Sequence, residues 1–465
     1  MDHDELAHWS KIAADWARDY HATLRDRPVR PNIAPGEFRA LIEAPVPEQP
    51  DPIAEIFDDF TGTVPDAMTH WQHPRFFAYF PANAAPASML AEQLANAMAA
   101  QAMLWQTAPA ANEMEALVID WLRDGLGLAP HFTGTIHDSA TTATFSAVLT
   151  MREKALGYEG LTAGLSAQPR LRLYASAQTH SSIDKAARLS GIGQDNLVKI
   201  PTRANDPLYG MDPGALEAAI MADRAAGHLP AGVILATGGT SIGACDDLAA
   251  CIAVAKRHGL PTHVDAAWAG SAMIAPEFRD LWQGVDGADS IVFNPHKWLG
   301  AQFDASVQFL RDPAPQIATM GLRPEYLKTQ GTDEVINYNE WTLPLGRRFR
   351  ALKLWFLLRA EGLSGLRGRI RNHVAWARAA AEDIRALPGF TITTEPILSL
   401  FTFALSSDAR TEALLEAVNR DGRLYLTQTT HEGRYVIRVS VGQYATTKED
   451  VSMIAPVLAE LAETL

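Results

Sequence analysis

Two side chains, Asp265 and Lys297, carry the clearest chemistry in this chain. Each lies at or just past the end of a short apolar stretch, at residues 261–265 and 290–293. A lysine in such a place can form a Schiff base with an aldehyde, and a carboxylate can pair with a protonated pyridine nitrogen. Pyridoxal phosphate needs both groups from a protein, so the pair predicts this cofactor.

Asp265 decides between two interpretations of Lys297. Taken alone, Lys297 is equally well explained as a strand-end lysine that reaches solvent. Asp265, however, lies between the apolar residues Val264 and Ala266. A buried aspartate without a partner is costly or becomes neutralised. The cofactor ring would supply that partner, which explains Asp265 better than a salt bridge to an unidentified arginine.

Two weaker signals fit the same cofactor. His180 follows a predicted strand and precedes a predicted helix, so its imidazole could stack on the cofactor ring. Taken alone, His180 is better explained as a histidine at a helix start that is held by local hydrogen bonds. Residues 134–144 are rich in threonine and lead into a predicted helix. Free N–H groups and hydroxyls at a helix N-terminus bind a dianion, and an ordinary N-cap is the alternative.

The elements that must position these residues alternate along the middle of the chain. Residues 170–176, 233–236, 261–265 and 290–293 are predicted strands, and 247–258 is a predicted helix. This alternation predicts an α/β fold with a mostly parallel sheet covered on both faces. Ligands of such sheets lie beyond the carboxyl ends of the strands, where Asp265 and Lys297 fall.

We expect three segments. Residues 1–84 form a helical arm, interrupted by the proline-rich run 44–52, and this arm must pack on another domain or on another subunit. Residues 85–352 form the large cofactor-binding domain, in which 89–111 is one buried helix. Residues 353–465 form a small α+β domain. In this last segment the predicted strands are 391–394, 398–405, 424–427 and 435–441, with a helix at 410–419 and a final helix behind a capping box, Thr446-x-x-Glu449.

Composition narrows the class of protein. The 465 residues carry a formal net charge of −14 without a basic stripe, which argues against nucleic acid as a partner. The two cysteines, Cys245 and Cys251, have no metal-binding spacing, so no metal is expected. Segment 89–111 is too polar to span a membrane. With an acidic N-terminus unlike a signal peptide, these features predict a cytoplasmic protein.

Several sequence blocks, in order along the chain, resemble one family. They are residues 71–81, 109–122, 178–182, 263–267, 294–298 and 344–350. Together they are similar to the aromatic L-amino-acid decarboxylases, among the group II pyridoxal-phosphate decarboxylases. The resemblance implies the aspartate-aminotransferase-like fold (fold type I of pyridoxal-phosphate enzymes). It also implies a homodimer with active sites at the interface.

The resemblance also implies residue roles. Lys297 would hold the cofactor covalently, Asp265 would pair with the ring nitrogen, and His180 and Ala267 would lie on the two ring faces. The expected phosphate ligands are Ala140, Thr141, Asn294 and His296, with Thr240 beside the cofactor, and the expected substrate pocket includes Trp71, Tyr79, Phe80 and Pro81.

The polar segment 323–333 is expected to form a mobile lid. Within it, Tyr326 matches the family's loop tyrosine, which is thought to protonate the substrate α-carbon after carbon dioxide leaves. Related aldehyde synthases carry phenylalanine there. Tyr326 therefore favours decarboxylation to an amine, although a loop tyrosine outside this context would be expected only to pack.

The chain departs from the family pattern within the expected substrate pocket. Gln101 and Met103 replace bulky apolar residues, and Gln101 could either bond a substrate hydroxyl or face a helix. Gly346 leaves room for a large ring. The expected substrate is phenylalanine, tyrosine, dopa or tryptophan. The alternatives are an aromatic aldehyde synthase, a decarboxylase of a non-aromatic amino acid, and a non-catalytic cofactor-binding protein on the same fold.

Overall fold

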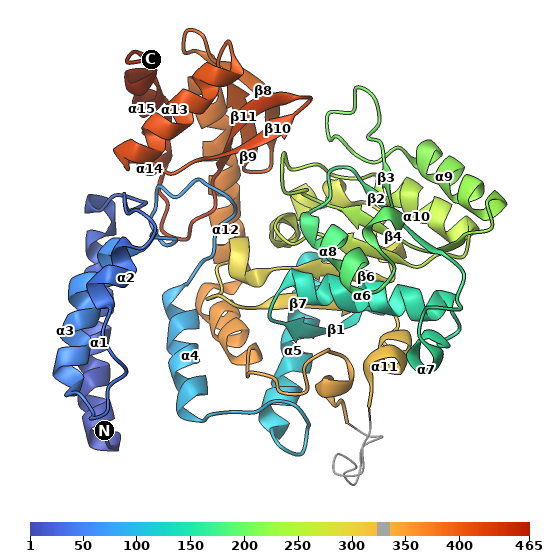
Figure 1. The fold of residues 1–465 in the computed structure, drawn as a ribbon, viewed down its shortest axis with the longest axis horizontal. Helices are drawn as coiled ribbons and strands as arrows, with labels where there is room; N and C mark the ends of the chain where they lie inside the picture. Colours follow the sequence, from blue (N-terminus) through green and yellow to red (C-terminus); the bar gives the residue numbers. More distant parts are fainter. Residues whose placement is uncertain (323–334) are drawn as a thin grey trace.

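A seven-stranded sheet forms the centre of the computed structural model, which describes residues 1–322 and 335–465 (Figure 1). The strand order is β1-β7-β6-β5-β4-β2-β3. Only β7 runs antiparallel to its neighbours, so the predicted α/β fold with a mostly parallel sheet is confirmed. The strands are β1 (Thr133–His137), β2 (Leu171–Ser176), β3 (Leu197–Ile200), β4 (Leu229–Ala236), β5 (Thr262–Asp265), β6 (Ser290–Phe293) and β7 (Ser306–Leu310).

Helices pack against this sheet and bury most of the side chains on its strands. Strands β5, β6 and β7 are buried along their whole length. Helix α6 contacts β4, β5, β6 and β7 across one face. The helices of this part are α4 (Pro86–Ala97), α5 (Pro109–Leu126), α6 (Ala140–Ala155), α7 (Gly160–Ala163), α8 (Ser181–Leu189), α9 (Pro213–Ala225), α10 (Leu248–Arg257) and α11 (Ala314–Met320).

A long helix, α12 (Ala351–Arg385), leads from this sheet to a second, four-stranded antiparallel sheet of order β10-β11-β9-β8. Helix α12 is kinked at Gly362, whose φ of 60° is the left-handed conformation that glycine tolerates best. The second sheet buries one apolar cluster against α12 and the C-terminal helices. Its elements are β8 (Thr391–Ile397), β9 (Leu400–Ala404), α13 (Asp408–Asp421), β10 (Thr427–His431), β11 (Arg434–Ser440), α14 (Lys448–Ser452) and α15 (Ile454–Ala462).

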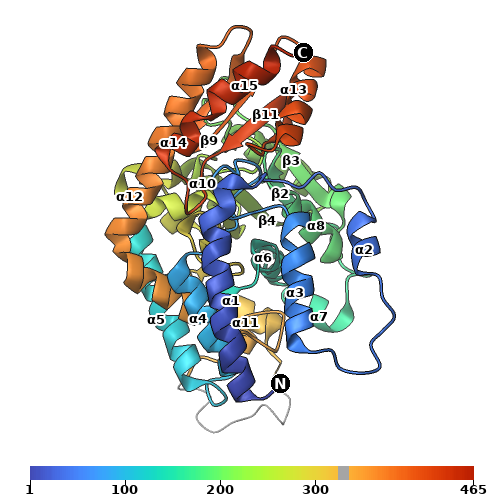
Figure 2. The ribbon, with the colours of Figure 1, turned by 90° about the vertical axis from the view of Figure 1, so that its left-hand side faces the viewer.

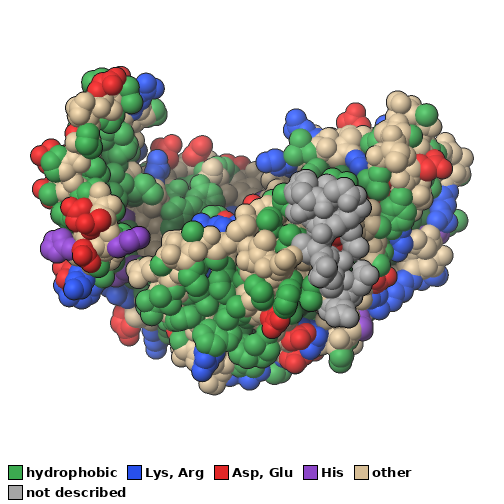
Figure 3. Space-filling view, turned by 90° about the horizontal axis from the view of Figure 1, so that it is seen from below, with side chains coloured by type: hydrophobic (Ala, Val, Ile, Leu, Met, Phe, Trp, Pro, Cys, Tyr) green, Lys and Arg blue, Asp and Glu red, His purple; other side chains and the backbone are tan. Residues whose placement is uncertain are grey.

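The N-terminal helices are α1 (His3–Thr23), α2 (Glu37–Ile42) and α3 (Ile53–Thr63), and none of the three contains a buried residue. Helices α1 and α3 lie side by side, with Trp16 packed against Phe60 (Figure 2). Figure 3 shows these helices standing beside a hollow, with hydrophobic side chains gathered on the neighbouring surface. No helix in the described part of the chain is long and apolar enough to cross a membrane.

The prediction of one helix over residues 89–111 is wrong. Helix α4 ends at Ala97, and Ala99 then adopts a φ of 46°, which no α-helix contains. Gln101 next forms a β-bridge with a distant segment, and α5 begins at Pro109. Pairing with a remote backbone therefore prevailed over the local apolar pattern.

The predicted strand 424–427 lies too early in the sequence. Tyr425 instead pairs with Phe76, and the ladder of β10 with β11 begins at Thr427. A contact with a segment about 350 residues away decides where this strand starts, which no local signal reveals.

The predicted capping box is displaced by one residue. The hydroxyl of Thr446 donates to the carbonyl oxygen of Pro74 at 2.6 Å, so it does not cap the helix. Thr447 is the N-cap of α14, and its reciprocal partner is Asp450, whose Oδ2 accepts from the Thr447 N–H at 3.0 Å.

Candidate active site

Lys297 lies on a π-helical turn, Pro295–Leu299, that directly follows β6. Its amine reaches a cavity of about 180 Å³ at the carboxyl ends of the parallel strands. Burial lowers the pKa of Lys297 to about 8, Asp265 opposes this change, and Arg438 adds to it. A substantial fraction of this amine is therefore neutral, and thus nucleophilic, near neutral pH.

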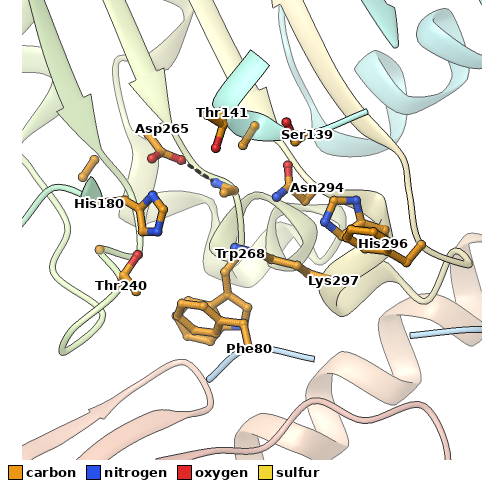
Figure 4. A pocket seen from close by; sticks show the side chains of 16 residues that line it. Phe80, Ser139, Thr141, His180, Thr240, Asp265, Trp268, Asn294, His296 and Lys297 are labelled. Atoms are coloured by element: carbon orange, nitrogen blue, oxygen red, sulfur yellow. Dashed lines mark hydrogen bonds between the residues drawn. The ribbon is translucent and has the colours of Figure 1, made fainter. Parts of the chain in front are cut away.

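Asp265 ends β5 and faces the same cavity with only 8% of its surface exposed. One carboxylate oxygen, Oδ1, accepts the N–H of Ala267 at 3.0 Å (Figure 4). Among the described residues, none hydrogen-bonds to Oδ2. Asp265 is therefore held in place through one oxygen and can offer the other to a cationic group in the cavity.

His180 is fixed in one tautomer by its role as the N-cap of α8. Its Nδ1 accepts the backbone N–H of Ser182 at 3.1 Å, so the ring proton resides on Nε2. Burial lowers the pKa of His180, which favours the neutral ring. His180, Asp265 and Thr240 lie on one side of the cavity, and the Lys297 side chain extends towards them (Figure 4).

Two donors on the opposite side are oriented by contacts at their other ends. Oδ1 of Asn294 accepts from the Ser306 hydroxyl at 2.8 Å, which leaves the Nδ2 donors of Asn294 for the cavity. Nδ1 of His296 accepts the Ala305 N–H at 3.0 Å, so Nε2 carries the proton. Burial lowers the pKa of His296 to about 3, and the ring is a neutral donor.

The N-terminus of α6 completes this side of the cavity. Ser139 is its N-cap and accepts the N–H of Thr142, while Ala140 and Thr141 follow within the first turn. All three of Ser139, Ala140 and Thr141 line the cavity. Free N–H groups and the positive end of the helix dipole bind an anion such as a phosphate.

A larger cavity of about 650 Å³ adjoins the first and shares Phe80, His180 and Lys297 with it. Its lining is mostly apolar and includes the aromatic rings of Trp71, Tyr79, Phe80 and Phe303. Phe80 stacks on Trp268 with ring centroids 4.7 Å apart, and Trp71 stacks on Tyr79 at 5.8 Å. Such walls suit a flat apolar group.

The structure brings together most of the residues expected at the site. Around the first cavity lie Ala140, Thr141, His180, Thr240, Asp265, Ala267, Asn294, His296 and Lys297. Around the second lie Trp71, Tyr79, Phe80 and Pro81. Tyr326 lies outside the described residues.

Three expected substrate-pocket residues, Gln101, Met103 and Gly346, line neither cavity of the chain. Oε1 of Gln101 accepts the backbone N–H of Arg347 at 2.7 Å, so the Gln101 side chain is hydrogen-bonded to the main chain. A Cβ on Gly346 would lie 3.0 Å from Nε2 of Gln101, which places these two residues next to each other on the surface.

Sequence reasoning overlooked Ser139, Trp268, Phe303 and Arg438 among the residues that line the two cavities. Arg438 is 4% exposed and donates to the carbonyl oxygens of Thr240 and Ser241 at 2.7 and 2.8 Å. The position of Arg438 between the apolar residues Ile437 and Val439 could have identified it from the sequence. The position of Ser139 directly before a helix could have identified that residue as well.

These residues fit pyridoxal phosphate. The cavity offers a nucleophilic amine in Lys297, a carboxylate in Asp265, and a cluster of oriented donors at Asn294, His296 and the start of α6. The three features match the aldehyde, the ring nitrogen and the phosphate of this cofactor.

Comparisons with known proteins agree with this geometry. The sequence model described as "Pyridoxal-dependent decarboxylase conserved domain" matches residues 35–406. The chain is 34% identical to the phenylacetaldehyde synthase of Arabidopsis thaliana, over 100% of this chain and 97% of that protein. It is 36% identical to the aromatic-L-amino-acid decarboxylase of Sus scrofa, over 95% and 93%. The crystal structure of Oryza sativa TDC with PLP and tryptamine superposes with a TM-score of 0.96 at 33% identity, covering 100% of this chain and 99% of that one.

Proposed function

Because the chain belongs to the pyridoxal-dependent decarboxylase family, we propose that it is a carboxy-lyase acting on an aromatic L-amino acid. Its products would be carbon dioxide and the corresponding amine. The observation that carries this proposal is the position of Lys297 and Asp265, which face one cavity beside a larger, aromatic-walled cavity.

When bound, pyridoxal phosphate supplies an aldehyde for covalent attachment and a protonated ring that accepts the electrons left by departing carbon dioxide. Lys297 contributes a partly neutral amine, since burial lowers its pKa to about 8. The carboxylate of Asp265 would pair with the ring nitrogen. His180 and Ala267, which line the same cavity, would hold the ring between them.

The phosphate would be held by neutral donors and a helix N-terminus. Asn294 and His296 direct N–H groups into the cavity because Ser306 and Ala305 bond their other ends. The first turn of α6 adds backbone N–H groups. None of these groups needs to change its protonation state, so the anchor would be stable across the working pH range.

The aromatic walls support an aromatic substrate. Trp71, Tyr79, Phe80 and Phe303 surround the larger cavity, whose volume of about 650 Å³ accommodates one or two rings. Arg438 donates to backbone carbonyls at this wall and shapes it.

One rival outcome remains specific enough to test. The chain is similar to the phenylacetaldehyde synthase of Arabidopsis thaliana, so an aromatic aldehyde synthase is the second candidate. Tyr326 decides between the two in our proposal. Its phenol would return a proton to the substrate α-carbon after carbon dioxide leaves, which directs the reaction to an amine.

We further propose that the protein acts as a homodimer. The arm formed by α1, α2 and α3 contains no buried residue, and Leu41, Ile42 and Ile56 on it are exposed. A partner would cover this arm and would receive Gln101, Met103 and Gly346 at its own substrate cavity. Light scattering coupled to gel filtration would test the dimer. The domain limits 1–84, 85–352 and 353–465 and the cytoplasmic location stay predictions.

The function is tested with the purified protein loaded with pyridoxal phosphate. Phenylalanine, tyrosine, dopa, tryptophan, histidine and glutamate are supplied separately while carbon dioxide, amine and hydrogen peroxide are followed. We expect amine and carbon dioxide in equal amounts from at least one aromatic substrate. The variant Lys297→Ala is the control that separates enzyme turnover from free cofactor chemistry.

A further inference from the structure

Asn83 bonds the turn that carries Lys297 through both its backbone and its side chain. Its backbone N–H donates to the carbonyl oxygen of His296 at 2.9 Å, and two residues later the N–H of Ala85 donates to that of Gly300 at 2.9 Å. The segment 83–85 therefore runs along the π-helical turn and bonds it near both ends.

The side chain of Asn83 adds three bonds at the centre of this contact. Its Nδ2 donates to the carbonyl oxygen of Lys297 at 2.7 Å and to that of Gly442 at 2.9 Å. Its Oδ1 accepts the N–H of Tyr444 at 2.8 Å. The residue is 1% exposed, so both amide donors and the amide oxygen are used inside the protein.

The surrounding packing leaves this turn little room to move. A Cβ on Gly442 would lie 2.8 Å from Cγ of Pro81 and 3.4 Å from Cδ1 of Trp298. Arg369, from α12, donates to the carbonyl oxygen of Leu299 at 2.9 Å. The segments 83–85, 295–300 and 442–444 thus meet at the backbone of Lys297, and the Asn83 amide bonds the other two segments to its own.

We propose that Asn83 is a positioning residue for Lys297, which fixes the backbone from which the lysine side chain enters the cavity. This inference rests on the proposed function, because it presupposes that Lys297 captures the cofactor. A fixed carbonyl keeps the Lys297 side chain in the direction from which its amine meets the cofactor aldehyde. Without the Asn83 amide, the carbonyls of Lys297 and Gly442 would be buried and unpaired, and the turn would relax to satisfy them.

The test compares Asn83→Ala with a matched control, Asn112→Ala. Asn112 is 3% exposed, and its Nδ2 also donates to two carbonyl oxygens, those of Leu104 and Ala108, at 3.0 and 3.1 Å. It does not line the cavity of Lys297. Both variants lose a buried amide, so they should lower the melting temperature of the protein by similar amounts.

The measured quantity is the rate constant with which cofactor-free protein captures pyridoxal phosphate covalently, followed by absorbance without any amino-acid substrate. Asn83→Ala removes all three side-chain hydrogen bonds, of which one holds the Lys297 carbonyl directly, and loss of that bond predicts a roughly threefold to tenfold slower capture. Asn112→Ala should capture at the wild-type rate. Equal slowing in both variants, or wild-type capture in Asn83→Ala, would overturn the proposal.

A Lys297→Ala background separates positioning from general damage. In that background the cofactor binds without a covalent link, and Asn83→Ala should leave its dissociation constant unchanged. An equally weakened affinity in the presence and absence of Lys297 would show that Asn83 only supports the site as a whole. A wild-type protein that fails to capture the cofactor would instead refute the proposed function.

Asn83→Asp provides a second variant should Asn83→Ala not fold. The new carboxylate keeps the acceptor for Tyr444 but faces the two carbonyl oxygens of Lys297 and Gly442, which repel it unless it is protonated. The capture rate of Asn83→Asp relative to wild type should therefore fall as the pH rises. A ratio that stays at one from pH 6 to 9 would contradict the proposal.

Discussion

Replacing Asp265 by Asn should speed the covalent capture of the cofactor but lower the turnover number. The substitution keeps the Oδ1 acceptor for the N–H of Ala267, which lies 3.0 Å away, so the local turn should survive. It removes the charge that raises the pKa of Lys297, and that pKa should therefore fall below about 8. The amine becomes more reactive, whereas the ring nitrogen of the bound cofactor loses its partner.

The magnitudes follow from these values. With a pKa of about 8, roughly a quarter of Lys297 is neutral at pH 7.5, against about 0.1% for an ordinary lysine. Removing Asp265 can therefore speed covalent capture of the cofactor by about fourfold at most. Loss of one partner of a buried ion pair costs about 3–5 kcal/mol, so turnover should fall by roughly 10²–10⁴-fold.

The assay measures the capture rate against pH by stopped-flow absorbance, and the turnover number with saturating cofactor. The capture profile of Asp265→Asn should shift to lower pH while the turnover number collapses. Asp223→Asn is the control, because Asp223 is buried but bonds Arg172 and Tyr174 and does not line the site. A profile that shifts to higher pH, or a turnover number within tenfold of wild type, would refute the reasoning.

Three further predictions follow from the same structure. Lys297→Met should stabilise cofactor-free protein by about 3 kcal/mol below pH 8, because the buried lysine there carries a charge that its lowered pKa disfavours, and this gain should disappear towards pH 10.5. Chemical denaturation at several pH values would measure it, and a gain that grows with pH would contradict it. Tyr326→Phe should divert the product from amine to aldehyde, with ammonia and hydrogen peroxide detectable by coupled assays, and unchanged amine formation would argue against a proton-donating Tyr326. Arg347→Met leaves the carboxylate of Glu115, 2.6 Å away and 2% exposed, without its cation, and should lower the free energy of unfolding by about 3–5 kcal/mol. The control Arg371→Met breaks an exposed ion pair and should lower it by less than about 1 kcal/mol. Equal losses in the two variants would refute the distinction between buried and exposed pairs.

Local patterns in the sequence were sufficient to predict the mostly parallel sheet and the positions of Asp265 and Lys297. Strands β5 and β6 are short and buried, and their ends place Asp265 and Lys297 at one edge because parallel strands share a direction. That inference needs only the period of the pattern and the topology of parallel sheets. The cofactor followed from the chemistry of the pair.

Other features depend on contacts that no local pattern encodes. Tyr425 pairs with Phe76, which moves the start of β10, and a hydrogen bond to Pro74 takes Thr446 away from its expected capping role. Gln101 pairs with a backbone more than two hundred residues away. In each case a long-range hydrogen bond prevailed over local propensity, as expected when buried polar groups must all find partners.

The most direct test of the central claim is a product analysis with isotope-labelled aromatic substrates. Each amino acid, labelled at its carboxyl carbon, is incubated with the cofactor-loaded protein and with Lys297→Ala, and labelled carbon dioxide, amine, aldehyde and peroxide are quantified together. The proposed function predicts equal amounts of labelled carbon dioxide and amine from an aromatic substrate, no peroxide, and no turnover by Lys297→Ala. Aldehyde with peroxide, or no labelled carbon dioxide from any aromatic amino acid, would contradict it.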